Sequence, residues 1–230
     1  MRKNSYIRLA LLALPLSLPA PAFDEAHDFD FHAKAPVTTT LGSFLESEVE
    51  NRIEKVSGHK LQKFELAARS IEIAMALAEA SYVHKVDPFL LLSMIEVESR
   101  YDVTAVGLHG ELGLMQIKPS TARWIAPISD ELYNCDLHGI RCNIMMGASY
   151  VGHLQNRTGT RHTIALFREH VLRSYNLGPA RANRMESARL PATEFTHQVA
   201  GDSGAASYAS KIAKHADRLR SRYLAVASAQ

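Results

Sequence analysis

The chain has 230 residues, of which 47% are hydrophobic and 22% are charged. This composition excludes a disordered or fibrous chain and provides enough apolar side chains for one sizeable core. The formal net charge is only +2, and we see no basic stripe along the sequence. The charge pattern therefore does not favour a nucleic-acid partner.

The N-terminus has the pattern of an export signal. Three basic residues and no acidic one occur in residues 1–8, residues 9–19 (LALLALPLSLP) are apolar, and residues 20–22 (APA) offer small side chains for cleavage after Ala22. A membrane anchor is the alternative, but the apolar stretch is too short for a full span and contains two prolines. We therefore expect a periplasmic protein whose signal peptide, residues 1–22, is removed.

The chain has two cysteines, Cys135 and Cys142, separated by the polar segment DLHGIR. In an oxidising compartment such a close pair can form a disulfide that closes a surface loop. Two free buried thiols are the alternative. No CxxC or HExxH spacing accompanies the pair, so we expect no metal site.

The first half of the chain contains three candidate helices. Residues 23–42 are polar and lack a helical apolar stripe, so we expect a loose lead-in there. A helix is possible over residues 43–56, and the spacing of apolar side chains predicts another over residues 61–84. An Asp-Pro pair at residues 87–88 is a typical helix start. The helix that follows, to about residue 100, is apolar on nearly all sides and should be central and buried.

The second half of the chain predicts a loop followed by further helices. Three glycines punctuate residues 101–114, which we interpret as a loop. Helical spacing then predicts helices over residues 119–127, 143–153, 163–175 and 207–225, the third of them stopped by Gly178-Pro179. The sequence thus predicts a mostly α protein with roughly six to eight helices. We expect a single folded domain over residues 61–226, after an N-terminal lead-in over residues 23–60.

Two carboxylates, Glu96 and Glu98, lie on the apolar helix. Burying a carboxylate costs free energy unless the group is paired or takes up a proton. Arg100 follows Glu96 at a spacing that favours an ion pair on a helix, which indicates a structural role for Glu96. Glu98 has no such partner, and burial together with the negative end of the helix dipole should raise its pKa. It could then donate a proton to a leaving group. A glutamate that reaches water at a helix end is the alternative.

Three motifs follow one another along the chain: ESRYD at residues 98–102, GLMQI at residues 113–117 and YNLGP at residues 175–179. Together they resemble the SLT-type lytic transglycosylases of the lysozyme-like superfamily, over about residues 80–182 and more weakly as far as Tyr208. The resemblance implies a lysozyme-like domain around a substrate cleft. It also implies the glycan strands of peptidoglycan as substrate, and no metal or other cofactor.

The resemblance also implies roles for individual residues. Glu98 takes the place of the general acid/base that cleaves the MurNAc–GlcNAc β-1,4 bond and leaves 1,6-anhydro-MurNAc ends. Substrate-binding positions fall on Ser99, Met115, Gln116, Tyr175, Asn176 and Tyr208. A thioether can pack on a sugar face, an amide can bond to N-acetyl groups, and the serine would support the oxyanion or the substrate. Taken singly, these residues would instead be interpreted as a core methionine, a loop-capping glutamine and a helix-terminal asparagine.

Glu111 departs from the family pattern, which usually has a small or neutral residue just before GLMQI. Retaining hydrolases need a second carboxylate, so Glu111 keeps open a hydrolysing muramidase, and Asp102 is the other acid nearby. A non-catalytic peptidoglycan-binding assembly protein with the same fold is the remaining alternative. The small size fits a role beside secretion or conjugation machinery, and we expect a monomer. Trp124 lies in an apolar helix pattern and is expected in the core, with stacking on a sugar as the alternative.

Overall fold

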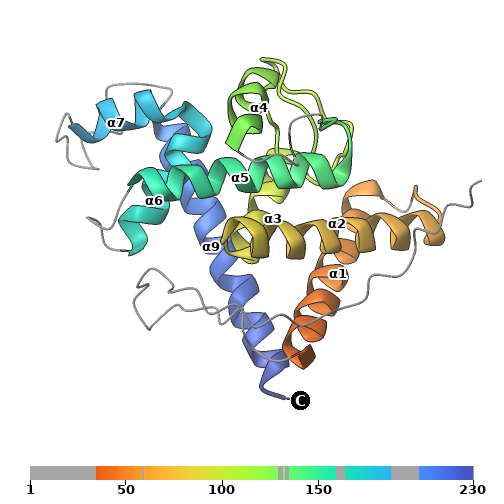
Figure 1. Ribbon diagram of the computed structural model, residues 1–230. Coiled ribbons are helices and arrows are strands. Elements are labelled where there is room, and N and C mark those ends of the chain that lie inside the picture. Colours follow the sequence, from red (N-terminus) through yellow and green to blue (C-terminus); the bar gives the residue numbers. More distant parts are fainter. Residues whose placement is uncertain are drawn as a thin grey trace, which may run out of the picture. The chain divides into compact units, whose positions relative to one another are not determined.

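Figure 1 shows the computed structural model, which describes residues 35–58, 60–128, 132, 135–158, 164–187 and 202–229. Over these residues the chain forms eight α-helices, a short 3-10 helix and isolated β-bridges in place of a sheet. The elements are α1 (Ala35–Ser57), α2 (Lys63–His84), α3 (Pro88–Glu98), α4 (Pro119–Ile125), η1 (Ala126–Ile128), α5 (Ile140–Thr158), α6 (Ile164–Leu177), α7 (Pro179–Ser187) and α9 (Asp202–Ala227). None of these helices is both long and apolar enough to cross a membrane. The predicted mostly α architecture is confirmed, whereas the predicted signal peptide lies outside the described residues.

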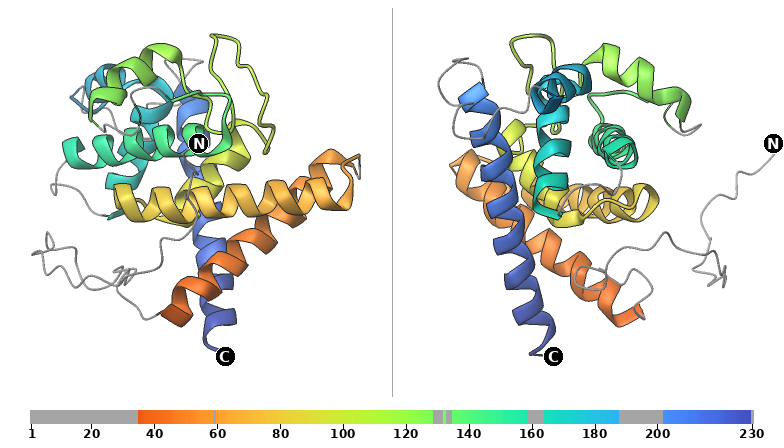
Figure 2. Two further views of the ribbon diagram at one scale, coloured as in Figure 1. Left: turned by 45° about the vertical axis from the view of Figure 1, so that its right-hand side comes forward. Right: turned by 90° about the vertical axis from the view of Figure 1, so that its left-hand side faces the viewer.

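Helix α3 lies at the centre because nearly all of its side chains are apolar. Each residue from Pro88 to Ile95 is buried, since no face of this helix is polar enough to prefer water. Asp87 caps the helix by accepting a hydrogen bond of 3.0 Å from the backbone N–H of Phe89, and proline occupies the first helical position. Helix α2 packs against α1, α3 and α5, while α9 packs along α3 and α6 (Figure 2).

Three aromatic rings fasten the first and last of these helices to α3. The centroid of Phe89 on α3 lies 6.0 Å from that of Phe44 on α1 and 5.5 Å from that of Tyr223 on α9. The rings of Phe44 and Tyr223 are also 5.5 Å apart, and all three side chains are buried. Aromatic pairs at such separations contribute about 0.5–1.5 kcal/mol each beyond their buried area. The cluster therefore stabilises α1 and α9 on the central helix.

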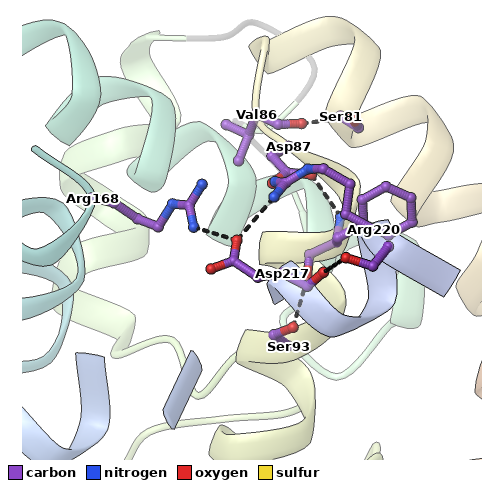
Figure 3. A network of polar contacts seen from close by, with 9 residues as sticks. Ser81, Val86, Asp87, Ser93, Arg168, Asp217 and Arg220 are labelled. Carbon is purple, nitrogen blue, oxygen red and sulfur yellow. Dashed lines mark hydrogen bonds and ion pairs between the residues drawn. The ribbon is translucent and has the colours of Figure 1, made fainter. Parts of the chain in front are cut away.

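A polar network fixes the position of α9 against α3 and α6 (Figure 3). Arg220 of α9 pairs with Asp87 at the start of α3 and also donates a hydrogen bond of 3.0 Å to Asp217. Arg168 of α6 donates to the same oxygen of Asp217 at 2.7 Å. The guanidinium of Arg220 lies 5.9 Å above the ring of Phe89. Because breaking a partly buried pair leaves an unpaired charge, the network holds α9 in one register along α3.

Several element boundaries differ from those predicted. Helix α1 begins earlier than predicted, at Ala35. Its first turns carry no apolar stripe, so the sequence pattern did not reveal them. Helix α3 ends at Glu98 rather than at residue 100. Helix α7 begins directly after α6: Gly178 ends α6 with φ 84°, and Pro179 then takes the first position of the next helix. The Gly-Pro pair therefore ends one helix and begins the next.

The predicted disulfide between Cys135 and Cys142 is present, with Cα atoms 5.6 Å apart. It connects the segment before α5 to the first turn of that helix. Neither cysteine remains free, so the alternative of two buried thiols is wrong. The bridge therefore restrains the segment that precedes α5. This helix also anchors the loop of residues 105–117.

Candidate active site

Glu98 is the last residue of α3 and is half-buried. Its Oε1 accepts a hydrogen bond of 2.5 Å from the hydroxyl of Tyr208 on α9. Burial raises the pKa of Glu98 to about 7; the Tyr208 hydrogen bond acts to lower it, and the negative charge of Glu111 acts to raise it. The carboxyl group is therefore protonated in about half of the molecules near neutral pH.

The chain turns away sharply after Glu98. The backbone N–H of Ser99 bonds to the carbonyl of Ile95 at 3.1 Å, and its hydroxyl donates to the same carbonyl at 3.3 Å. Arg100 and Tyr101 then adopt left-handed backbone angles, with φ 52° and 65°. Such angles cost non-glycine residues about 1–3 kcal/mol each and persist only where the surroundings enforce them. The Ser99 hydroxyl thus bonds to the backbone of the helix that it follows.

The predicted ion pair between Glu96 and Arg100 is wrong. Glu96 pairs instead with Arg52 of α1, whose Nε donates to Oε2 at 2.9 Å and whose Nη2 contacts Oε1. The prediction assumed that the helix continued to residue 100, but Arg100 lies beyond its end in a left-handed conformation and is exposed. The structural role expected for Glu96 holds, since its carboxylate joins α3 to α1.

The loop over residues 105–117 is braced by Gln116. Its Nε2 donates to the carbonyls of Ala105 at 3.2 Å and of Gly113 at 2.9 Å, and its own backbone is left-handed with φ 49°. Isolated bridges pair Leu112 with Val106 and with Ile117. The Nε2 of the Gln116 amide thus bonds within the loop, and substrate binding by this residue stays a prediction.

Met115 lies inside the protein. Its side chain is fully buried, and a Cβ on Gly147 of α5 would lie 2.3 Å from its sulfur, so only glycine fits there. Its backbone N–H donates to Oδ1 of Asn143 at 2.7 Å, and its carbonyl accepts from the hydroxyl of Tyr175 at 2.8 Å. Met115 is therefore a core residue in this structure and joins the loop to α5 and α6, whereas its packing on a sugar stays a prediction.

The two site tyrosines converge on Glu98 from different helices. Burial raises the pKa of Tyr175 on α6, and the charge of Glu98 raises it further; the same two causes raise the pKa of Tyr208 on α9. The ring of Tyr175 also lies 5.2 Å from that of Tyr150. Asn176, the next residue on α6, is exposed. Glu98, Tyr175 and Tyr208 therefore form one cluster.

Glu111 lies on the loop over residues 105–117 and is a second carboxylate near Glu98. Its Oε1 lies 3.2 Å from Nζ of Lys118, and its Oε2 accepts the backbone N–H of His109 at 2.9 Å. Burial acts to raise the pKa of Glu111, but backbone hydrogen bonds, including that of His109, and Lys118 outweigh it and hold this pKa below its usual value. A residue larger than glycine at Gly107 would meet this carboxylate, 2.4 Å from Oε2. Glu111 is thus ionised at neutral pH, whereas Glu98 is half protonated.

Asn143 is an anchor of the loop over residues 105–117 that the sequence did not reveal. The buried Asn143 side chain accepts from the Met115 N–H and donates to the carbonyls of Leu112 at 2.8 Å and Leu137 at 2.9 Å. An asparagine among apolar helix residues was the only signal for this anchor.

Trp124 is not in the core: it is 46% exposed, and its ring packs edge-on against Tyr150 at 6.0 Å. Helix α4 is short and peripheral, so its apolar pattern did not imply burial.

The site combines one carboxyl group that exchanges its proton near neutral pH with a second one that stays ionised. Two carboxyl groups with separated pKa values are the arrangement that acid–base chemistry on glycosides uses. Within the described residues, no group of three or more histidine, cysteine or acidic side chains could hold a metal ion. Glu98 can transfer a proton to and from a bound substrate, because its carboxyl group exchanges a proton near neutral pH.

Comparison with known protein families identifies the family of this chain. The family model of the transglycosylase SLT domain matches residues 75–194, more than half of the chain. The chain belongs to the SLT transglycosylase family. The SLT domain is lysozyme-like, so the predicted fold is confirmed, and membership implies a transglycosylase that acts on peptidoglycan. No individual curated protein matches the chain. The match includes Glu98 and Tyr175 but ends before Tyr208, so α9 makes its contact with Glu98 from outside the matched region.

Proposed function

We propose that this SLT domain is a lytic transglycosylase that cleaves the MurNAc–GlcNAc β-1,4 bond with Glu98 as its single general acid/base. The observation that carries the proposal is the half-buried Glu98 carboxyl group, whose pKa is raised to about 7 and which contacts the Tyr208 hydroxyl. A general acid works best when its pKa lies near the operating pH. An ordinary exposed glutamate, with a pKa near 4.5, would hold almost no proton there.

In the proposed reaction, Glu98 first gives its proton to the glycosidic oxygen, and the bond from that oxygen to C1 of MurNAc breaks. The carboxylate that remains then removes the proton of the C6 hydroxyl of the same sugar. The freed oxygen attacks C1, closing the 1,6-anhydro ring and returning the proton to Glu98. No water is consumed. The Tyr208 hydrogen bond favours the carboxylate form, so it stabilises Glu98 after the first proton transfer.

Glu111 has an electrostatic role in this proposal. Its charge helps to keep Glu98 protonated before the reaction and favours the positive charge that develops on the sugar as the bond breaks. Both of its oxygens are engaged, one by Lys118 and the other by the His109 N–H. These contacts support a fixed charge rather than an attacking nucleophile.

The hydrolysing muramidase is the second candidate, because Glu111 is close enough to Glu98 for its charge to affect the pKa of Glu98. In that reading Glu111 would act as the second carboxylate of a retaining hydrolase. The two candidates differ in their products, since hydrolysis leaves reducing ends whereas the lytic reaction leaves anhydro ends. A non-catalytic binding protein would release neither.

The remaining substrate contacts are proposed at the surface of the cluster. Asn176 is exposed beside Tyr175, where its amide can bond to N-acetyl or hydroxyl groups. Ser99 lies next to Glu98, and its hydroxyl oxygen can still accept a hydrogen bond. Met115 and Gln116 contribute indirectly, by holding the loop that carries Glu111.

We propose that the enzyme acts in the periplasm after removal of residues 1–22, beside secretion or conjugation machinery. The export motif in the sequence and the disulfide between Cys135 and Cys142 support this location. The mass of the protein recovered from a periplasmic fraction tests it, because cleavage after Ala22 gives a defined mature N-terminus.

Digestion of purified sacculi tests the catalytic proposal. Mass spectrometry of the released fragments should find anhydro ends with wild-type protein and none with Glu98→Gln, which cannot donate a proton. Reducing ends in place of anhydro ends would establish the muramidase instead. If wild type and Glu98→Gln both release nothing from sacculi or from soluble glycan strands, the protein is a binding protein.

A further inference from the structure

A pocket of about 410 Å³ lies on the side of α3 that faces α1 and α9. Its size is within the usual range for small-ligand sites. Five of the side chains around it are basic or imidazole, and a single one is acidic. The lining consists of Arg52, Glu96, Val97, Lys211, Lys214, His215 and Arg218.

Among the described residues, a single carboxylate lines this pocket beside its five basic or imidazole side chains. This carboxylate, Glu96, already accepts hydrogen bonds from two nitrogens of the Arg52 guanidinium. Lys211, Lys214 and Arg218 are exposed, and no carboxylate among the described residues pairs with any of them. Unpaired cations around one cavity create a field that attracts anions. The pocket therefore has a net positive charge and room for an anionic group.

These cations form a stripe that begins beside the catalytic cluster. Lys211, His215 and Arg218 recur at helical spacing on α9, and Lys211 lies one turn after Tyr208, the residue bonded to Glu98. Val97, which also lines the pocket, is the neighbour of Glu98 on α3. The expectation of no basic stripe is therefore wrong. Apolar and acidic residues separate the cations in the sequence, and only the helix gathers them.

We propose that this pocket binds the carboxylate groups of the peptide stems of peptidoglycan while the glycan strand lies at Glu98. The inference rests on the proposed function. In peptidoglycan the lactyl group of each MurNAc is linked to a peptide, so the negative charges of the polymer lie on its stems and not along its sugars. A stem leaves the strand at the sugar whose bond is cut, which brings its carboxylates to the side of the cleaved bond.

The dimensions agree with this occupant. From Lys211 to Arg218 the stripe extends about 10 Å along α9 at 1.5 Å per residue. An extended peptide advances about 3.3–3.6 Å per residue, so three residues of a stem cover this distance. The structure thus assigns to α9 two contacts with one substrate: Tyr208 at the reacting carboxyl group and the cations at the peptide.

The first test compares cleavage of glycan strands that carry their stems with cleavage of strands stripped of peptides by an amidase. We expect the double variant Lys214→Glu/Arg218→Glu to lose about fivefold or more in kcat/KM on stem-bearing strands, the scale of two exposed ion contacts. Its activity on stripped strands should be unchanged. The matched control is Lys60→Glu/Lys63→Glu, which reverses two exposed lysines outside the pocket and should behave as wild type.

Equal losses on both substrates, or none on either, would overturn the proposal. The second test is titration of wild-type protein with the free stem peptide, with the same peptide amidated at its carboxyl groups, and with inorganic phosphate. We expect binding of the free peptide that amidation and the double variant both abolish. Equal binding of the amidated peptide, or binding of phosphate without peptide, would contradict a carboxylate site for stems. This titration is independent of cleavage, so it gives an answer even if Glu98 is not catalytic.

Discussion

The hydroxyl of Tyr208 donates a hydrogen bond of 2.5 Å to the carboxyl group of Glu98 across 110 positions of sequence. The bond joins the end of the central helix α3 to the first part of α9. It is the contact through which the last helix takes part in the site. Removing it changes both the proton affinity of the acid and the position of its carboxyl group.

Replacing Tyr208 by phenylalanine should therefore slow the enzyme and move its pH profile. The lost hydrogen bond stabilises the carboxylate, so the pKa of Glu98 rises and the alkaline limb of kcat/KM moves to higher pH. We expect kcat to fall about tenfold, the scale of one hydrogen bond to a charged group. Initial rates on soluble glycan strands across the pH range measure both effects. An unchanged alkaline limb would show that the bond does not act on the titrating group.

Replacing Glu111 by glutamine should move the profile in the opposite direction. The negative charge of Glu111 raises the pKa of Glu98, so its removal lowers that pKa and shifts the alkaline limb to lower pH. The products should still carry anhydro ends, because the carboxylate is not the nucleophile in the proposed reaction. A variant that binds strands but has lost all cleavage would favour the muramidase. Lys118→Met serves as the matched control, since it removes the partner of Glu111 and leaves the carboxylate in place.

Glu98→Gln should make the protein more stable at alkaline pH. The pKa of folded Glu98 lies near 7, above its ordinary value of 4.5, so ionisation is more costly in the folded state than in the unfolded state. Wild type therefore loses stability as the pH rises from about 4.5 through 7, at up to about 1.4 kcal/mol per pH unit. The glutamine variant does not titrate. Urea unfolding should find a difference in free energy between the two proteins that grows over this range and is constant above about pH 8. A difference that is flat from acid to alkaline pH would contradict the raised pKa.

Asn143→Ala should destabilise the fold by about 2–4 kcal/mol, because it leaves the buried N–H of Met115 and the carbonyl of Leu137 without partners. The Leu112 carbonyl loses one bond and keeps the one from the Ile117 N–H. The loop over residues 105–117 is held to α5 by these bonds, so activity should fall as well. Chemical denaturation measures the stability. Asn51→Ala is the control, since that asparagine is exposed on α1 and should change stability by less than about 0.5 kcal/mol.

The sequence was most informative where one segment determined its own structure. Asp87 and Pro88 predicted the start of α3, and its all-round apolar composition predicted its burial, because capping and burial depend on neighbours along the chain. Glu98 was identified as a candidate acid for the same reason. The disulfide followed from two cysteines close in sequence.

Contacts between distant segments were predicted less well. The partner of Glu96 is Arg52, on a helix far away in the sequence, so the nearest arginine was assigned instead. Met115 is buried because Gly147 makes room for its sulfur, and neither residue reveals this alone. The basic stripe on α9 depends on helical periodicity and on Glu96 being already paired, which only the fold determines.

The family match covers residues 75–194, yet Phe89 packs on Phe44 and Tyr223, and Asp87 pairs with Arg220. A chain trimmed to the matched residues would keep Glu98 and lose Tyr208, the aromatic partners of Phe89 and the cation beside Asp87. The apolar faces of α3 that α1 and α9 now cover would then meet water. The packed core that surrounds Glu98 is therefore larger than the matched region and includes α1 and α9, the helices on either side of it.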